Sequence, residues 1–151
     1  VRRIKRKLSV YRRYPRMSYL ELYKPDEKPL AIMVPAWNET GVIGNMAELA
    51  ATTLDYENYH IFVGTYPNDP DTQRDVDEVC ARFPNVHKVV CARPGPTSKA
   101  DCLNNVLDAI TQFERSANFA FAGFILHDAE DVISPMELRL FNYLVERKDL
   151  I

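Results

Sequence analysis

Three acidic side chains lie close together near the C-terminal end of the chain, in the segment His127-Asp-Ala-Glu-Asp131. They follow an apolar run that predicts a strand, and strand alternation places Asp128 and Glu130 on the same side. Carboxylate oxygens are the ligands that Mg²⁺ and Mn²⁺ prefer, and these ions also bind substrate phosphates. Because adjacent acids without a basic neighbour repel one another, we expect Asp128, Glu130 and Asp131 to hold such an ion. The alternative is an acidic turn that caps the next helix.

Three further residues beside predicted strand ends have side chains that suit ligand binding. Lys99 opens a predicted helix, whose N-terminus attracts anions, so it is either a phosphate ligand or an ordinary surface lysine. Trp37, the only tryptophan, either stacks on a flat base or packs at the rim of the core. His127 is either a metal ligand or a buried histidine at a strand end, and we favour the second because the carboxylates suffice.

The glycines exclude two common phosphate-binding motifs. The five glycines include no G-x-G pair, and the chain has no G-x-x-x-x-G-K segment. Neither a dinucleotide fingerprint nor a P-loop is therefore present. A phosphate ligand would need another counter-charge, and the acidic segment with a metal ion or Lys99 could supply it.

Alternating apolar patterns predict the elements that position these residues. Short runs rich in β-branched residues predict strands, and three- and four-residue spacing predicts helices. The predicted strands are 30–34, 59–65, 86–92 and 119–126, the last buried on both faces. The predicted helices cover about 42–54, 71–83 with Asp71 or Thr72 as N-cap, 99–113, and a stretch that begins at Ser134 as N-cap and Pro135. This β-α-β-α-β-α-β-α order predicts an α/β fold with a parallel sheet and helices on both faces.

The carboxyl ends of parallel strands meet at one edge of the sheet, and ligands of open α/β folds bind there. The segments that follow the predicted strands are therefore the candidate site. They are Pro35–Glu39, Tyr66–Asp69, Ala92–Lys99 and His127–Asp131.

Three of these segments together resemble the family-2 glycosyltransferases. Pro35-Ala-Trp-Asn-Glu39 resembles the P-x-Y-N-E segment that ends their first strand. Ser98-Lys-Ala-Asp-Cys-Leu-Asn104 resembles their K-A-x-A-L-N segment. Asp128-Ala-Glu-Asp131, followed by a P-x-x-L segment, resembles the D-A-E-D version of their D-x-D motif. Each segment alone is weak evidence for the family, but the three occur in the family's order and each lies at a strand end.

The resemblance implies a truncated GT-A fold, a Rossmann-like and mostly parallel sheet, over residues 30–151. Residues 1–29 would be a basic juxtamembrane lead-in. The implied reaction is inverting transfer of a sugar from a nucleotide-diphosphate sugar, most often UDP-linked, to a glycan or other acceptor, as in polysaccharide biosynthesis. The nearest resemblance is to enzymes at the cytoplasmic face of the bacterial inner membrane. In this family the general base lies on a later segment, so we expect it beyond Ile151 and expect the chain alone to be inactive.

Roles within the site also follow from the resemblance, position by position. Metal ligation, by Mg²⁺ or Mn²⁺, falls to Asp128 with either Glu130 or Asp131. The implied substrate-binding residues are Trp37 and Glu39 at the base and ribose, Asp69 at the base, and Lys99 and Asn104 at the nucleotide and its diphosphate. The second strand ends in Thr65-Tyr-Pro-Asn-Asp69 rather than in the adjacent acids usual for the family, which makes Asp69 the least secure of these.

Charge is distributed unevenly along the chain. Residues 1–16 carry eight lysines and arginines and no acid, whereas the rest holds all 21 acidic residues. An acidic body argues against nucleic-acid binding, which needs basic side chains on the binding face. The cationic tail is typical of a segment that lies on an anionic membrane surface after a transmembrane helix. Both ends look cut from a longer protein.

Two other functions fit parts of the pattern. A non-catalytic α/β module that binds a nucleotide or a partner would use the same strand ends without transferring a group. A nucleotidyltransferase on a similar sheet would usually need a glycine-rich first loop, which this sequence lacks. Metal-dependent binding of UDP would favour the glycosyltransferase.

Overall fold

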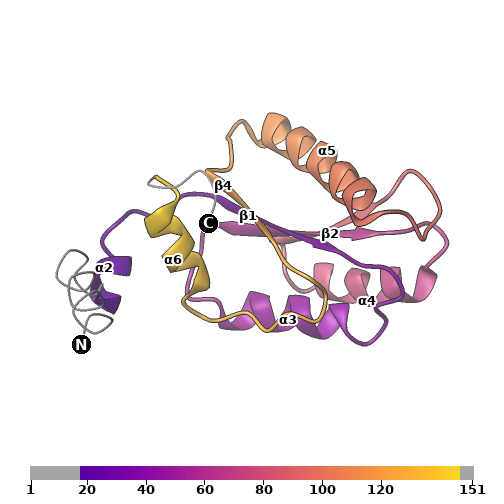
Figure 1. The fold of residues 1–151 in the computed structure, drawn as a ribbon, viewed down its shortest axis with the longest axis horizontal. Coiled ribbons are helices and arrows are strands. Elements are labelled where there is room, and N and C mark those ends of the chain that lie inside the picture. Colours follow the sequence, from indigo (N-terminus) through magenta and orange to yellow (C-terminus); the bar gives the residue numbers. More distant parts are fainter. Residues whose placement is uncertain (1–17, 147–151) are drawn as a thin grey trace, which may run out of the picture.

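A four-stranded parallel sheet forms the centre of the computed structural model, which describes residues 18–146 (Figure 1). Its spatial order is β3-β2-β1-β4, and β1 pairs with β2 and with β4. The strands are β1 (Leu30–Pro35), β2 (Tyr59–Thr65), β3 (Val86–Val90) and β4 (Gly123–Leu126). The helices are α2 (Tyr19–Leu22), α3 (Ile43–Thr53), α4 (Pro70–Cys80), α5 (Lys99–Ala117) and α6 (Glu137–Leu144). The predicted α/β class, element order and parallel sheet are confirmed.

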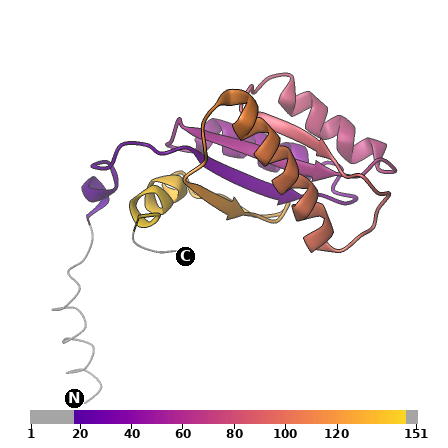
Figure 2. The same ribbon diagram turned by 90° about the horizontal axis from the view of Figure 1, so that it is seen from above.

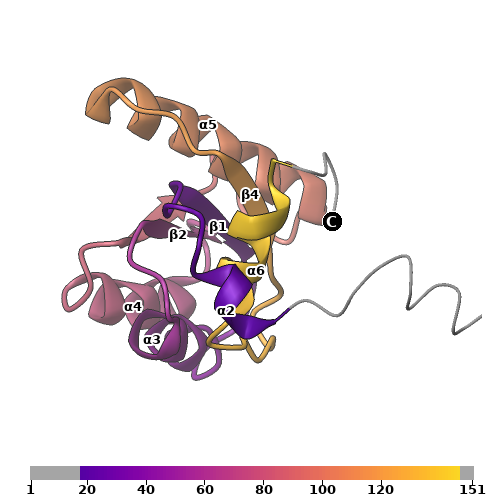
Figure 3. The ribbon, with the colours of Figure 1, turned by 90° about the vertical axis from the view of Figure 1, so that its left-hand side faces the viewer.

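Helices cover both faces of the sheet, as predicted from the element order. Side chains alternate along β1, so Leu30 and Ile32 belong to one core and Ala31 and Met33 to another. The first core joins the sheet to α3, α4 and α6, and the second joins it to α5 (Figures 2 and 3). None of the helices within residues 18–146 is long and apolar enough to cross a membrane.

The fourth strand is shorter and more exposed than the sequence predicts. It covers only Gly123–Leu126, at the edge of the described sheet, and Phe124 and Leu126 are 50% and 47% exposed. Both project from the face that α5 covers elsewhere, but α5 packs over β1, β2 and β3. The prediction of a strand over 119–126 buried on both faces is therefore wrong. The strand is shorter because the apolar run begins before it and supplies Phe121 to the core beneath α5. It is exposed because α5 packs mainly over the other three strands.

Two helix starts also differ from the prediction. The N-cap of α4 is Asp69, not Asp71 or Thr72; its carboxylate accepts the N–H of Thr72, and Pro70 takes the first helical position. Helix α6 begins at Glu137, after a turn in which Ser134 accepts a backbone bond through its carbonyl. Proline at a first helical position suits both Pro70 and Pro135, but only the first opens a helix here.

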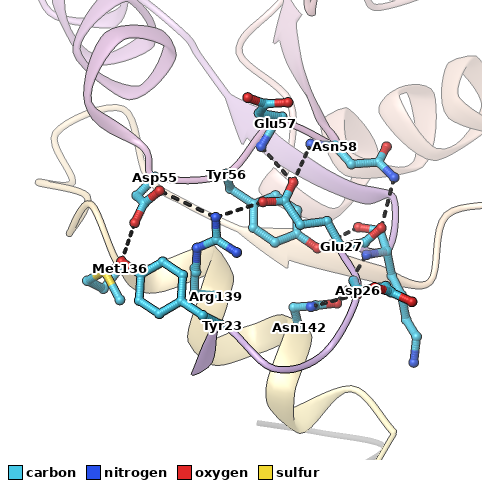
Figure 4. Close-up of polar contacts among 11 residues, drawn as sticks. Tyr23, Asp26, Glu27, Asp55, Tyr56, Glu57, Asn58, Met136, Arg139 and Asn142 are labelled. Atoms are coloured by element: carbon cyan, nitrogen blue, oxygen red, sulfur yellow. Dashed lines mark hydrogen bonds and ion pairs between the residues drawn. The ribbon is translucent and has the colours of Figure 1, made fainter. Parts of the chain in front are cut away.

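Residues 18–29, which we call the strap, precede β1 and pack against α6 (Figure 4). Arg139 of α6 lies 4.4 Å from the ring centre of Tyr23. Its Nη2 atom is 2.9 Å from Oε1 of Glu27 and 3.4 Å from Oδ1 of Asp55. One guanidinium thus joins the strap, α6 and the segment that follows α3, which suits its planar, multiply donating shape.

A buried amide makes a second link between the strap and α6. Asn142 is only 2% exposed; it accepts the N–H of Lys28 at 3.2 Å and donates to the carbonyl of Asp26 at 3.0 Å. A buried polar group needs such partners to offset its desolvation. The part of the predicted lead-in that the structure describes therefore packs on the body, whereas the basic tail of residues 1–16 lies outside the described residues.

Candidate functional site

A pocket of about 380 Å³ lies at the carboxyl ends of β1, β2 and β4, where the sequence predicts the site. The segment after β1 contributes Trp37 and Glu39, and β2 is followed by Tyr66. The end of the loop before α5 contributes Thr97, and the first residue of α5 is Lys99. The segment after β4 contributes Asp128, Ala129 and Glu130. Four segments distant in sequence therefore meet around one pocket.

The segment after β1 is shaped by an unusual backbone position at Asn38. This residue has a φ of 57°, in the left-handed region that asparagine tolerates better than most side chains. Its N–H donates to Oδ2 of Asp69 at 2.6 Å, and the N–H of Glu39 donates to Oγ1 of Thr72 at 3.0 Å. These bonds to the start of α4 place Trp37 and Glu39 at the pocket.

An aromatic wall forms one side of the pocket. The rings of Trp37 and Tyr66 meet edge to face, with centres 5.2 Å apart. Gly95 lies so close to Trp37 that a Cβ atom there would be 2.5 Å from the indole ring. Asn68 fixes Gly95 in place, because its side chain donates to the Gly95 carbonyl and accepts the Gly95 N–H, both at 2.7 Å. Trp37 is therefore a partly exposed wall residue with one edge packed.

Lys99 and Asp128 face each other across the pocket and form an ion pair. Ser98 caps α5 by accepting the N–H of Asp101 at 3.1 Å, which puts Lys99 at the first position of a long helix. The sequence expectation that the acids lack a basic neighbour is wrong. The partner is 29 residues away along the chain, and it comes close because the start of α5 and the end of β4 lie at the same pocket.

Asp131 points away from the pocket. Its Oδ2 atom accepts the N–H of Asp128 at 2.8 Å and lies 3.1 Å from Nδ1 of His127. The Asp128 N–H, followed by His127, holds the pKa of Asp131 below its ordinary value. His127 itself is 11% exposed and lies between Asp131 and Glu137, outside the pocket, so it is a largely buried strand-end histidine, as we favoured.

Glu130 and Glu39 contribute negative charge to the same pocket. Burial raises the pKa of Glu39 above its ordinary value, and the carboxylates of Glu130 and then Asp69 raise it further. Raised carboxyl pKa values mark places where a cation would be favourable. Within residues 18–146, no three histidine, cysteine or acidic side chains form a group that could hold a metal ion by themselves.

Two of the predicted site residues do not line the pocket. Asp69 is 8% exposed, and its carboxylate is occupied by the N–H groups of Asn38 and Thr72. Asn104 is exposed on α5, one turn beyond Lys99. Conversely, Tyr66 and Thr97 line the pocket and hydrogen-bond through their hydroxyls at 2.8 Å. Both lie in the predicted strand-end segments, but their types and spacing carry no signal that singles them out.

Comparison with known proteins agrees with this arrangement. The family model described as "Glycosyltransferase like family 2" matches residues 25–150. Bacteriophage adsorption protein B of Escherichia coli (strain K12) is 99% identical to the chain over 151 residues, and so is Bacteriophage N4 adsorption protein B of Escherichia coli O157:H7. Both relatives cover the whole chain, which spans 20% of their length. The sheet is consistent with a GT-A domain, and the predicted family is confirmed. The chain belongs to the glycosyltransferase-like family 2.

Proposed function

We propose that the chain is the donor-binding part of an inverting glycosyltransferase that uses a nucleotide-diphosphate sugar, with UDP as the nucleotide. The observation that carries this proposal is the pairing of Lys99 with Asp128 across a pocket that also has an aromatic wall. A nucleotide sugar offers a flat base, a ribose and a diphosphate. The aromatic, carboxylate and cationic side chains that meet here match those three parts.

The base and ribose would bind beside Trp37 and Glu39. An aromatic face suits stacking on a base, and a carboxylate accepts hydrogen bonds from ribose hydroxyls. Asp69 would support this segment without contacting the donor, because its carboxylate accepts the N–H of Asn38. Asn104 lies on the exposed surface of α5 and would contribute only to a part of the donor that extends beyond the pocket.

The diphosphate would bind between the N-terminus of α5 and the acids after β4. Lys99 and the helix N-terminus both attract phosphate oxygens. Asp128 and Glu130, rather than Asp131, would hold a divalent ion, because Asp131 is occupied by His127 and a backbone N–H. Such an ion, Mg²⁺ or Mn²⁺, offsets the charge that develops on a diphosphate leaving group. Lys99 would then pair with a phosphate oxygen in place of Asp128.

The acceptor and its activation are assigned to the rest of the longer protein. The described residues supply a donor pocket, and we place the general base that takes the acceptor proton beyond Ile151. The acceptor is proposed to be a glycan and the location the cytoplasmic face of the bacterial inner membrane. The adsorption-protein names of the relatives and the eight basic residues in 1–16 support a membrane setting.

Turnover of a radiolabelled UDP-sugar tests this proposal. We expect the full-length protein to transfer or hydrolyse the sugar with Mn²⁺, and Asp128→Asn to remove that activity. Asp108→Asn, which alters an exposed aspartate of α5 away from the pocket, should leave it unchanged. Residues 1–151 alone should be inactive, because the proposal places the base and the acceptor site beyond Ile151. An inactive full-length protein that still binds UDP would instead favour a non-catalytic module.

A further inference from the structure

The segment 127–131, which we call the acidic loop, connects β4 to the turn before α6. His127 starts the loop, and its N–H donates to the carbonyl of Met33 on β1 at 3.1 Å. Its side chain points away from the donor pocket into the space between the loop and α6, where it is 11% exposed. The residue before the pocket acids is thus tied to the sheet through its backbone.

Each ring nitrogen of His127 faces a carboxylate. Nδ1 lies 3.1 Å from Oδ2 of Asp131, and Nε2 lies 2.6 Å from Oε1 of Glu137, the first residue of α6. The Glu137 side chain is 18% exposed, so its charge is largely removed from water and needs this partner. His127 therefore bridges the loop and the helix.

Asp131 connects His127 to Asp128, which lines the pocket. The same Oδ2 atom that faces His127 accepts the N–H of Asp128 at 2.8 Å, and the N–H of Asp131 donates to the carbonyl of Asp128 at 3.1 Å. The backbone of Asp128 is thereby fixed from behind, while its side chain pairs with Lys99 in front. None of His127, Asp131 and Glu137 lines the donor pocket.

We propose that His127 is a positioning residue that, held by Glu137, sets the acidic loop so that Asp128 and Glu130 face Lys99. This proposal rests on the proposed function for its role in donor binding. Groups that orient ligating carboxylates matter strongly, and their loss typically weakens metal binding about 10- to 100-fold. A site also tolerates displacements of only about 0.5 Å.

Helix α6 keeps Glu137 in place because α6 itself is fixed by contacts to the strap. Arg139 and Asn142, on the same helix as Glu137, make the contacts to strap residues shown in Figure 4. Contacts therefore run without a break from the strap through α6 and His127 to Asp128. Glu137 can hold the loop in place only if α6 itself does not shift.

Hydrogen–deuterium exchange in the full-length protein tests the positioning role directly. We expect His127→Asn to speed exchange of the Asp128 and Asp131 amides about tenfold, the effect of losing roughly 1.4 kcal/mol of hydrogen bonding. His87→Asn is the matched control, since His87 is also partly buried but packs against Phe62 on the other face of the sheet. Wild-type exchange of the loop in His127→Asn would overturn the proposal.

A second pair of variants guards against a general loss of folding. Glu137→Gln keeps an oxygen beside Nε2, so the loop amides should exchange close to the wild-type rate. Glu137→Leu removes both oxygens and should reproduce the effect of His127→Asn, with exchange in β1 and β2 unchanged. Equal exchange of the loop in the two Glu137 variants would contradict the bridge.

Binding of UDP separates this inference from the proposed function. With Mn²⁺ present, His127→Asn should raise the Kd of UDP about 10- to 100-fold, whereas the Kd without metal should stay within about twofold. Faster exchange with an unchanged Kd would overturn the role of His127 in the site. If the wild-type protein shows no Mn²⁺-dependent UDP binding, the proposed function and the role in donor binding fail, and exchange still decides whether His127 holds the loop.

Discussion

Replacing Asp69 with alanine tests whether this residue supports the site from behind or contacts the ligand itself. Its carboxylate caps α4 by accepting the N–H of Thr72 and holds the loop after β1 by accepting the N–H of Asn38 at 2.6 Å. It is 8% exposed and does not line the pocket. Asp69→Ala should therefore destabilise the fold.

The size of the effect follows from the two bonds. Loss of an N-cap side chain typically costs about 0.5–2 kcal/mol. Loss of a charged acceptor for the Asn38 N–H costs about 1.5–3 kcal/mol, less where water replaces it. We expect a total of about 2–4 kcal/mol for Asp69→Ala. Asp69→Asn retains an acceptor oxygen and should cost about 1 kcal/mol or less, since asparagine is an equally good N-cap.

Urea unfolding of residues 1–151 measures this, with the fluorescence of Trp37, the only tryptophan, as the signal. Asp71→Ala is the control: Asp71 is exposed and pairs with Arg74 at the surface, so its loss should cost less than about 0.5 kcal/mol. Equal stability of Asp69→Ala and Asp71→Ala would refute the structural role. Weaker UDP binding by Asp69→Asn at unchanged stability would instead support the base contact implied by the family resemblance.

Three further predictions concern the core, its pH dependence and the tail. Gly64→Ala should destabilise the fold by about 1–3 kcal/mol in urea unfolding, because a Cβ there would lie 2.5 Å from Sγ of Cys102. Gly44→Ala should be neutral or stabilising, since its nearest neighbour is 3.4 Å away and alanine favours a helix. Burial, followed by His60, lowers the pKa of His87 to about 4. An unfolded histidine titrates near 6.5, so the free energy of unfolding should fall as the pH drops from about 6.5 to 4. Unfolding at pH 7 and 4.5 should show that His87→Gln removes about 2 kcal/mol of that fall, and an identical pH dependence would contradict the assignment. Finally, deleting residues 1–16 from the full-length protein should weaken its salt-sensitive binding to phosphatidylglycerol vesicles, by about 1 kcal/mol of binding free energy per basic residue. If the deletion leaves the salt dependence of vesicle binding unchanged, the tail has no role in it.

Much of the fold could be predicted because the local patterns and the tertiary structure agree. Apolar runs ended by proline or by asparagine and aspartate mark β1 and β2, and helical spacing marks α3 to α5. Parallel order then places the strand ends at one edge. This order predicts that Trp37, Glu39, Lys99, Asp128 and Glu130 lie together, and all five line the pocket.

The differences arise where the outcome depends on distant partners. The exposure of β4 depends on how far α5 extends across the sheet, which no local pattern records. The pairing of Lys99 with Asp128 and the bridge from His127 to Glu137 likewise depend on tertiary placement. The cap of α4 is different, because aspartate before proline at Asp69 is itself an N-terminal signal. There the family resemblance assigned a ligand contact to a residue whose local pattern indicated a structural role.

Calorimetric titration of UDP into the full-length protein, with and without Mn²⁺, shows whether the acids after β4 hold a divalent ion at the donor diphosphate. We expect Mn²⁺ to tighten UDP binding and Asp128→Asn to remove this gain. Asp108→Asn, on the exposed surface of α5, should keep it. Mn²⁺-dependent binding that survives Asp128→Asn unchanged would contradict the claim that the acids after β4 and Lys99 together hold the donor diphosphate.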